Sequence, residues 1–218
     1  MDRSQKHKRI DSIDFWRGIV LVSIFVNHIP GNIFEYLTHK NIGLSDAAEA
    51  FVFLSGVSVA LAYGRRFLNG ELGTPTRALG RRALTIYGVQ VMLSLVAVAL
   101  FVTAAILFDD EGLLAEHGRD IVLADPARAL LAIVGLSHQL GYFNILPLYI
   151  VLLLGTPAIL ALARVSSFLM LVVSALVYVG ARTTGLNLPT WPVEGEWFFN
   201  PFTWQFQFCI GLFIGLHL

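Results

Sequence analysis

Residues 14–30 read Asp14-Phe-Trp-Arg17-Gly-Ile-Val-Leu-Val-Ser-Ile-Phe-Val-Asn27-His28-Ile-Pro30. Apart from a few polar residues, this stretch is apolar and close to the length of about 20 residues that a membrane-spanning helix needs. It nevertheless contains an arginine and a histidine. An ionisable side chain in the hydrocarbon layer costs at least about 2.5 kcal/mol on insertion scales, so Arg17 and His28 mark a candidate functional site.

Arg17 and His28 lie on one face of this expected helix but cannot touch. They are eleven residues apart, which brings His28 back to within about 20° of Arg17 and places it about 16 Å further along the axis. Each residue also has a simpler interpretation. Arg17 can reach the membrane surface and pair with Asp14 three residues earlier, and a backbone carbonyl can satisfy His28 at the helix exit.

The composition excludes a soluble globular protein. Of the 218 residues, 56% are hydrophobic and 14% are charged, whereas soluble domains carry about 25% charged residues. The net charge is zero and there is a single cysteine, Cys209. No nucleic-acid partner, disulfide framework or metal site is therefore expected. We expect an integral membrane protein.

Six apolar runs predict an all-α, polytopic transmembrane helical bundle. Their lengths are near those that cross ~30 Å of hydrocarbon, and they cover residues 15–30, 47–63, 83–108, 141–163, 166–180 and 201–218. The run at 127–136 is too short to cross and predicts an interfacial or re-entrant helix. Because the last run stops at Leu218 without a polar flank, we expect residues 1–218 to be the N-terminal part of a single transmembrane domain.

The distribution of basic residues predicts a cytoplasmic N-terminus. With six spans, ten Lys and Arg residues fall on the side of the N-terminus, and short loops rich in these residues stay in the cytoplasm. His28 is then expected toward the outer side and Arg17 toward the cytoplasm. Four basic residues fall on the outer side: Lys40, Arg119, Arg128 and Arg182.

The second span has a face that is acidic at its outer end and small further in. At helical spacing, that face carries Asp46, Glu49, Phe53, Gly56 and Ala60, so it can line a cavity. A carboxylate at its outer end can orient His28 and stabilise the charged ring. Two alternatives stay open: Asp46 can simply cap the helix, and Ser55 with Gly56 can simply allow close helix packing.

Further polar residues in or beside the spans are candidates for lining a cavity. Polar groups in a span need partners or water, and Pro147 is expected to free backbone carbonyls within the fourth span. Tryptophan near a membrane face is also a common interfacial anchor. The candidates are Asn27, Ser55, Gly56, His138, Asn144, Tyr149, Trp204 and Gln205.

Several of these segments together resemble a known family. The opening helix of the membrane acyltransferase-3 superfamily is similar to the run Arg9-Ile-Asp-Ser-Ile-Asp14-Phe-Trp-Arg17-Gly18 with Asn27-His28, and its second-helix element is similar to Phe53-Leu-Ser55-Gly56. Within that superfamily the chain resembles the OpgC family. This likeness spans residues 9–213 and includes the runs Leu44-Ser-Asp46-Ala-Ala-Glu49, Asn144-Ile-Leu-Pro147-Leu-Tyr149 and Asn200-Pro201-Phe-Thr-Trp204-Gln205.

The resemblance implies a multispanning enzyme of the bacterial inner membrane. Such enzymes add succinyl groups to osmoregulated periplasmic glucans, with a coenzyme A thioester, here succinyl-coenzyme A, as donor substrate and no bound cofactor. The superfamily's catalytic histidine corresponds to His28 and its first-helix arginine to Arg17. The implied partners are membrane lipid, the glucan acceptor, acyl-coenzyme A and proteins of glucan synthesis. Members usually have about ten spans, which agrees with a domain that continues beyond six.

The leading hypothesis is O-acyl transfer. His28 acts as general base on a glucan hydroxyl or relays the acyl group, since histidine titrates near neutral pH, and Asp46 or Glu49 orients it. Arg17, with Asp14 beside it, is expected to hold donor phosphates near the cytoplasmic side, because a guanidinium group fits phosphate well.

Two rival interpretations stay open. Intramembrane acids and histidines also serve as proton relays, so the chain can instead be a proton-coupled transporter or exporter of a glycan. The other rival is an inactive fragment. A succinyl donor additionally carries a free carboxylate that needs a cation, for which Arg128, Arg182 and a residue beyond Leu218 are the candidates.

Overall fold

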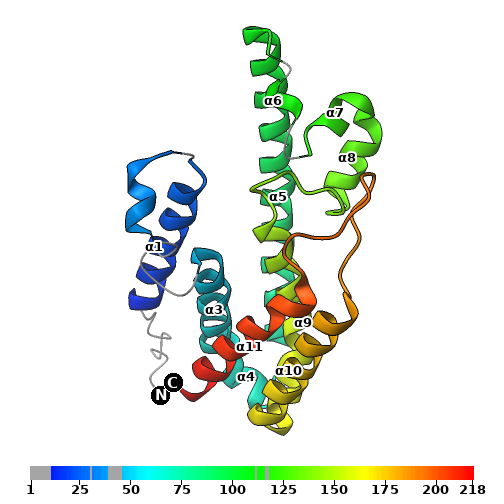
Figure 1. The fold of residues 1–218 in the computed structure, drawn as a ribbon. Helices are drawn as coiled ribbons and strands as arrows, with labels where there is room; N and C mark the ends of the chain where they lie inside the picture. Colours follow the sequence, from blue (N-terminus) through cyan, green and yellow to red (C-terminus); the bar gives the residue numbers. More distant parts are fainter. Residues whose placement is uncertain (1–10, 30, 39–45, 111, 116–117) are drawn as a thin grey trace.

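The computed structural model describes residues 11–29, 31–38, 46–110, 112–115 and 118–218. Within these ranges the protein is all-α, as expected, with one isolated β-bridge between Pro189 and Glu196. The helices form an elongated bundle in which α5 rises above its neighbours (Figure 1). The longer elements are α1 (Asp11–Asn27), α3 (Ala47–Val59), α5 (Gly73–Phe108), α8 (Pro126–Val134), α9 (Ile145–Val165), α10 (Ser167–Thr184) and α11 (Pro201–His217).

Short elements fill the connections. The π-helical turn η2 (Ala60–Gly64) and α4 (Arg65–Leu68) continue α3, so that residues 47–68 form one uninterrupted helical segment. The remaining short elements are the 3-10 helix η1 (Ile33–Leu37), α6 (Gly112–Ala115) and α7 (Asp120–Ala124).

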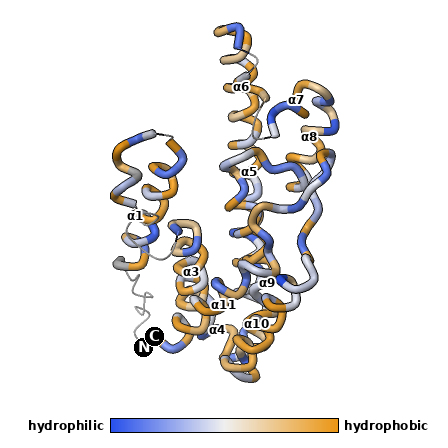
Figure 2. The backbone as a smooth tube through the Cα atoms, in the orientation of Figure 1, coloured by the Kyte–Doolittle hydropathy of each residue, from blue (hydrophilic) through white to orange (hydrophobic). Residues whose placement is uncertain are grey.

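Among the described residues, four helical segments are long and apolar enough to cross a membrane. They are Ala47–Leu68, Gly73–Phe108, Ile145–Val165 and Ser167–Thr184, and Figure 2 shows hydrophobic residues running along them. The first and sixth expected spans correspond to α1 and α11, which have 17 residues each. The chain is therefore a helical membrane protein, and the crossing by α1 and α11 stays a prediction.

Local sequence signals explain where several helices begin. Asn200 caps α11 by accepting a hydrogen bond from the Phe202 N–H at 2.9 Å, and Pro201 occupies the first helical position, where its missing N–H costs nothing. Ser166 alone separates α9 from α10, and its hydroxyl accepts from the Leu169 N–H at 3.3 Å. A serine cap thus turns the chain from one long helix directly into the next.

The core lies where α3, α9 and α11 meet. Its fully buried side chains include Leu148, Leu153 and Leu160 of α9 and Phe208 and Leu212 of α11. The outer helices α5 and α10 bury little of their surface inside the protein. In the most apolar 18-residue stretch of each, 17% is buried, whereas the figure is 56% for the segment that begins with α3. Such uncovered apolar surface suits contact with lipid.

Helices α3 and α11 pack backbone against backbone. A Cβ atom added at Gly56 would lie 2.1 Å from the Phe208 carbonyl oxygen, and one added at Gly211 would lie 2.1 Å from the Phe53 carbonyl oxygen. Gly211 and Gly215 form a small-xxx-small pair, the usual means by which membrane helices approach closely. The prediction that Gly56 permits close packing is confirmed.

Two sequence expectations about helix boundaries are wrong. The third span was expected to begin near residue 83, but α5 begins at Gly73, so Arg77, Arg81 and Arg82 lie in the helix. Pro147 was expected to interrupt a span, yet it is the third residue of α9. The first four N–H groups of a helix have no helical partner, so a proline there leaves the helix intact. The short helix expected at 127–136 is confirmed as α8.

The ends of the helices define one end of the bundle that carries most of the candidate residues. We call it the His28 end: α1 and α10 finish there, and α3, α9 and α11 begin there (Figure 1). The ring contact between His28 and Tyr142, just before α9, joins the end of α1 to this group.

Candidate functional site

His28 follows α1 directly and is held by two described contacts. Its Nδ1 bonds to the Ile24 carbonyl oxygen, and its ring meets the Tyr142 ring edge to face, with centroids 4.6 Å apart. A carbonyl can only accept, so in the neutral ring Nδ1 carries the proton and Nε2 has a free lone pair. The side chain is exposed, and Nε2 is bonded to no residue that the structure describes. Both a satisfied helix-exit histidine and a proton acceptor fit this geometry.

Arg17 sits lower on α1 and pairs with Asp14. Its Nη1 lies 3.7 Å from Asp14 Oδ1, and its side chain is 19% exposed. Its Nε is buried and has no hydrogen-bond partner among the described residues. The expected pairing with Asp14 is confirmed, while a donor N–H group is left over. Its role in donor binding stays a prediction.

Asn27 fixes the loop that follows α1. Its Oδ1 accepts a hydrogen bond from the buried Thr38 hydroxyl at 2.6 Å. Asn32 adds bonds to the carbonyl oxygens of Val26 and Ile29. Asn27 therefore organises the backbone next to His28, and its place at a cavity stays a prediction.

Asp46 and Glu49 form a reciprocal cap at the start of α3. The Asp46 side chain accepts from the backbone at the first turn, and Glu49 Oε2 accepts from the Asp46 N–H at 3.3 Å. The capping interpretation of Asp46 is thereby confirmed. In the described part of the chain, no hydrogen bond or ion pair joins His28 to either carboxylate. Their orienting role toward His28 stays a prediction.

Two buried hydroxyls in the core lack partners among the described residues. They are Ser55 Oγ on α3 and Tyr149 OH on α9. The two helices meet here, because the Phe51 and Tyr149 rings are 5.8 Å apart, edge to face. Ser55 is completely buried and contacts no described base, so a nucleophilic role gains no support.

Two other candidates bond to the scaffold, and a third lies at the start of a helix. Gln205 of α11 accepts from the Ser174 hydroxyl at 2.6 Å and donates to the Ser174 carbonyl oxygen at 2.8 Å, which ties α11 to α10. His138 is buried and its Nε2 bonds to the Gly118 carbonyl oxygen at 2.7 Å. Asn144 occupies the cap position of α9 without a side-chain cap bond.

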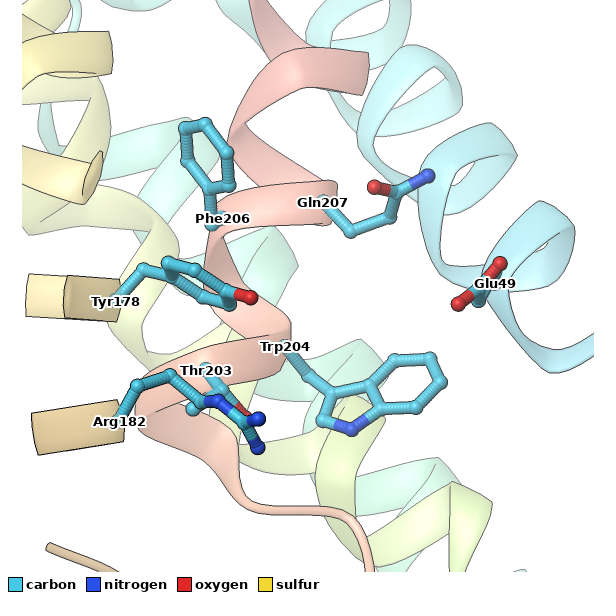
Figure 3. Close-up of a pocket in the computed structure, with 7 residues that line it drawn as sticks. All are labelled: Glu49, Tyr178, Arg182, Thr203, Trp204, Phe206 and Gln207. Atoms are coloured by element: carbon cyan, nitrogen blue, oxygen red, sulfur yellow. The ribbon is translucent and has the colours of Figure 1, made fainter. Parts of the chain in front are cut away.

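A cavity of about 510 Å³ opens between α3, α10 and α11 at the His28 end. Figure 3 shows Glu49 on one side of it, Tyr178 and Arg182 on the other, and Trp204 and Gln207 between them. Thr203 and Phe206 complete the lining. Glu49 and Trp204 were expected at a cavity, and Arg182 was an expected cation of the outer side. Tyr178, Thr203 and Phe206 were missed.

Two of the missed residues, Tyr178 and Thr203, carry a signal that the sequence does contain. Tyr178 and Arg182 are four residues apart, as are Thr203 and Gln207, so each pair lies on one helix face. What the sequence lacks is any sign that these two faces turn toward each other, because that depends on how α10 and α11 pack.

Comparison with known proteins gives one match. The family model described as OpgC protein matches residues 9–218. No curated protein and no solved structure matches the chain.

Proposed function

Because the chain belongs to the OpgC family, we propose that it is a membrane O-acyltransferase acting on osmoregulated periplasmic glucans. It transfers a succinyl group from a coenzyme A thioester to a glucan hydroxyl. Its place within the acyltransferase-3 superfamily is part of the same proposal, and rests on the resemblance of the first two helices.

The geometry of His28 carries this proposal. The bond from Nδ1 to the Ile24 carbonyl fixes the tautomer in which Nε2 can accept a proton. The edge-to-face contact with Tyr142 holds the ring in one orientation. The side chain is exposed at the end of the bundle, so a substrate hydroxyl can reach it. A general base needs this combination of free lone pair, fixed ring and access.

The transfer step follows from that arrangement. Nε2 of His28 takes the proton of a glucan hydroxyl while the hydroxyl oxygen attacks the thioester carbonyl. The carbon–sulfur bond breaks, the thiolate of coenzyme A leaves, and the imidazolium returns the proton to sulfur. The products are a succinyl ester and a free thiol. In this proposal Asp46, the N-cap of α3, or Glu49 in its first turn orients the His28 ring from the helix that packs beside α1.

Arg17 serves the donor in this proposal. It lies on α1 about 16 Å from His28 along the axis, and its Nε is an unpaired donor among the described residues. With the N-terminus in the cytoplasm of a bacterial inner membrane, the guanidinium group faces the coenzyme A phosphates. The thioester then extends along the helix toward His28.

The test compares two histidines with the same local hydrogen bond. His217 of α11 bonds through Nδ1 to the carbonyl oxygen four residues earlier, at 2.7 Å, as His28 does. Each variant, His28→Ala and His217→Ala, is expressed in a bacterium that makes these glucans but lacks its own succinyltransferase. Removing the general base is expected to lower succinylation by about 10²-fold or more, while His217→Ala leaves it near wild type.

The amount of glucan in the periplasm separates transfer from transport. Acyl transfer predicts a normal amount of glucan without succinyl groups in the His28→Ala strain. If the glucan itself disappears from the periplasm, the exporter interpretation is correct and the proposal is wrong.

A further inference from the structure

We propose that Arg182 binds the free carboxylate of the succinyl group, and that the cavity between α3, α10 and α11 holds a succinylated sugar. This inference deepens the proposed function and rests on it. A succinyl group differs from an acetyl group by its terminal carboxylate, so a cation that recognises it sets acyl specificity. The cavity is about 510 Å³, within the range of roughly 300–1,000 Å³ usual for small-molecule sites.

Two of the other basic residues expected on the same side are engaged elsewhere. Arg128 lies on α8 and pairs with Asp125, with Nε 3.3 Å from Oδ2. Arg119 is nine-tenths buried and its guanidinium group lies 4.0 Å from the centroid of the Phe101 ring. Lys40 lies outside the described residues. In contrast, Arg182 lines the cavity and makes no ion pair with any residue that the structure describes.

The remaining walls suit the sugar to which the succinyl group is attached. In Figure 3, Tyr178 and Thr203 lie on the side of Arg182, and the Trp204 indole lies between that side and Glu49. Indole rings provide an apolar face with a polar edge, which matches the apolar face and hydroxyl rim of a pyranose. On the α3 side of the cavity, the Glu49 carboxylate can accept hydrogen bonds from sugar hydroxyls, and the Gln207 amide can accept or donate them.

The separation of charge across the cavity gives the ligand a direction. Glu49 on α3 repels a carboxylate and accepts from hydroxyls, whereas Arg182 on α10 attracts a carboxylate as a bidentate donor. A succinyl ester of a sugar has both halves, with the carboxylate at one end and hydroxyls at the other. An acetyl ester of the same sugar has the hydroxyls but no carboxylate.

Binding to the purified chain in lipid nanodiscs tests this directly. The probes are a methyl glucoside with one succinyl ester and the same glucoside with one acetyl ester, each titrated calorimetrically. Wild type is expected to bind the succinyl ester more tightly. Loss of a charge-assisted hydrogen-bonded pair in Arg182→Gln should weaken that binding by roughly ten- to hundredfold and leave the acetyl ester almost unaffected. Arg182→Lys should restore part of the preference.

Arg128→Gln is the matched control, because it removes a cation expected on the same side that is already paired. It should retain the preference for the succinyl ester. An arginine in the last turn of α10 also stabilises that helix end, but such a role would not change the ratio between the two probes. Equal binding of both esters by wild type, or an unchanged ratio in Arg182→Gln, would overturn the inference.

The His28→Ala variant separates this inference from the proposed function. If succinyl-ester binding persists in His28→Ala and is lost in Arg182→Gln, the cavity is the succinyl site whatever the outcome of the transfer assay. If glucans of the His28→Ala strain keep their succinyl groups, the proposed catalytic role fails, and the binding ratios still decide the role of Arg182.

Discussion

Substitution of Gly56 by alanine should strongly destabilise the bundle. The added Cβ would lie 2.1 Å from the Phe208 carbonyl oxygen and 2.9 Å from the Leu212 nitrogen. Both are backbone atoms, so no side chain can turn aside, and α3 and α11 must move apart by more than an ångström. Overpacking of this kind costs about 1–3 kcal/mol, and the widened gap forfeits part of the dispersion energy along the whole contact. We expect a loss of about 3 kcal/mol in the free energy of unfolding.

The measurement is reversible unfolding in mixed lipid–detergent micelles, followed by helical circular dichroism. Gly155→Ala in α9 is the matched control, because nothing lies within 4 Å of a Cβ added there. Alanine favours helix by about 1 kcal/mol over glycine, so Gly155→Ala should be neutral or slightly stabilising. If Gly56→Ala and Gly155→Ala change the free energy of unfolding by the same amount, α3 and α11 do not pack backbone against backbone at Gly56.

Two further predictions concern polar residues at the helix contacts. Gln205→Leu removes both hydrogen bonds to Ser174 and should lower the free energy of unfolding, measured in the same assay, by about 1–2 kcal/mol. Gln207→Leu is the control, because Gln207 makes no hydrogen bond to any described residue, and it should leave the free energy of unfolding unchanged. Equal losses in the two variants would refute the contribution of the Gln205–Ser174 bonds. Asp46→Ala should lower the free energy of unfolding by about 1 kcal/mol, whereas Asp46→Asn, which still caps the helix, should leave it unchanged. If Asp46→Asn nevertheless abolishes succinylation, the charge of Asp46 acts on His28 and capping is not its whole role.

The fold could be predicted well because membrane helices are specified by local composition. Apolar length alone locates α9, α10 and α11 to within a few residues of their observed ends. The expectations failed where a helix continues through polar sequence. The polar stretch with Arg77 and Arg81 resembles a loop in sequence. Between Pro75 and the apolar part of α5, however, its one glycine, Gly80, disfavours the helix by only about 1 kcal/mol relative to alanine, and the helix extends to Gly73.

The candidate site was predictable only in part, because a cavity depends on tertiary packing. His28 and Glu49 stand out in the sequence as charged or titratable groups in apolar surroundings. Gln205 stands out equally, yet it bonds to α10, while its neighbour Gln207 lines the cavity. The difference is a rotation of about 200° around the axis of α11, which no local pattern specifies.

One face of α3 links the stability of the bundle to the candidate site. Glu49 and Gly56 are seven residues apart, so they lie on the same side of the helix, toward α11. At Gly56 the two backbones touch, whereas near Glu49 the side chains of Trp204 and Gln207 occupy the space and the cavity opens. Small residues at the crossing therefore fix the separation of the helices one to two turns from the cavity. A change at Gly56 that forces α3 from α11 alters the distance between Glu49 and Trp204 as well, so the shape of the cavity depends on the same glycines that stabilise the fold.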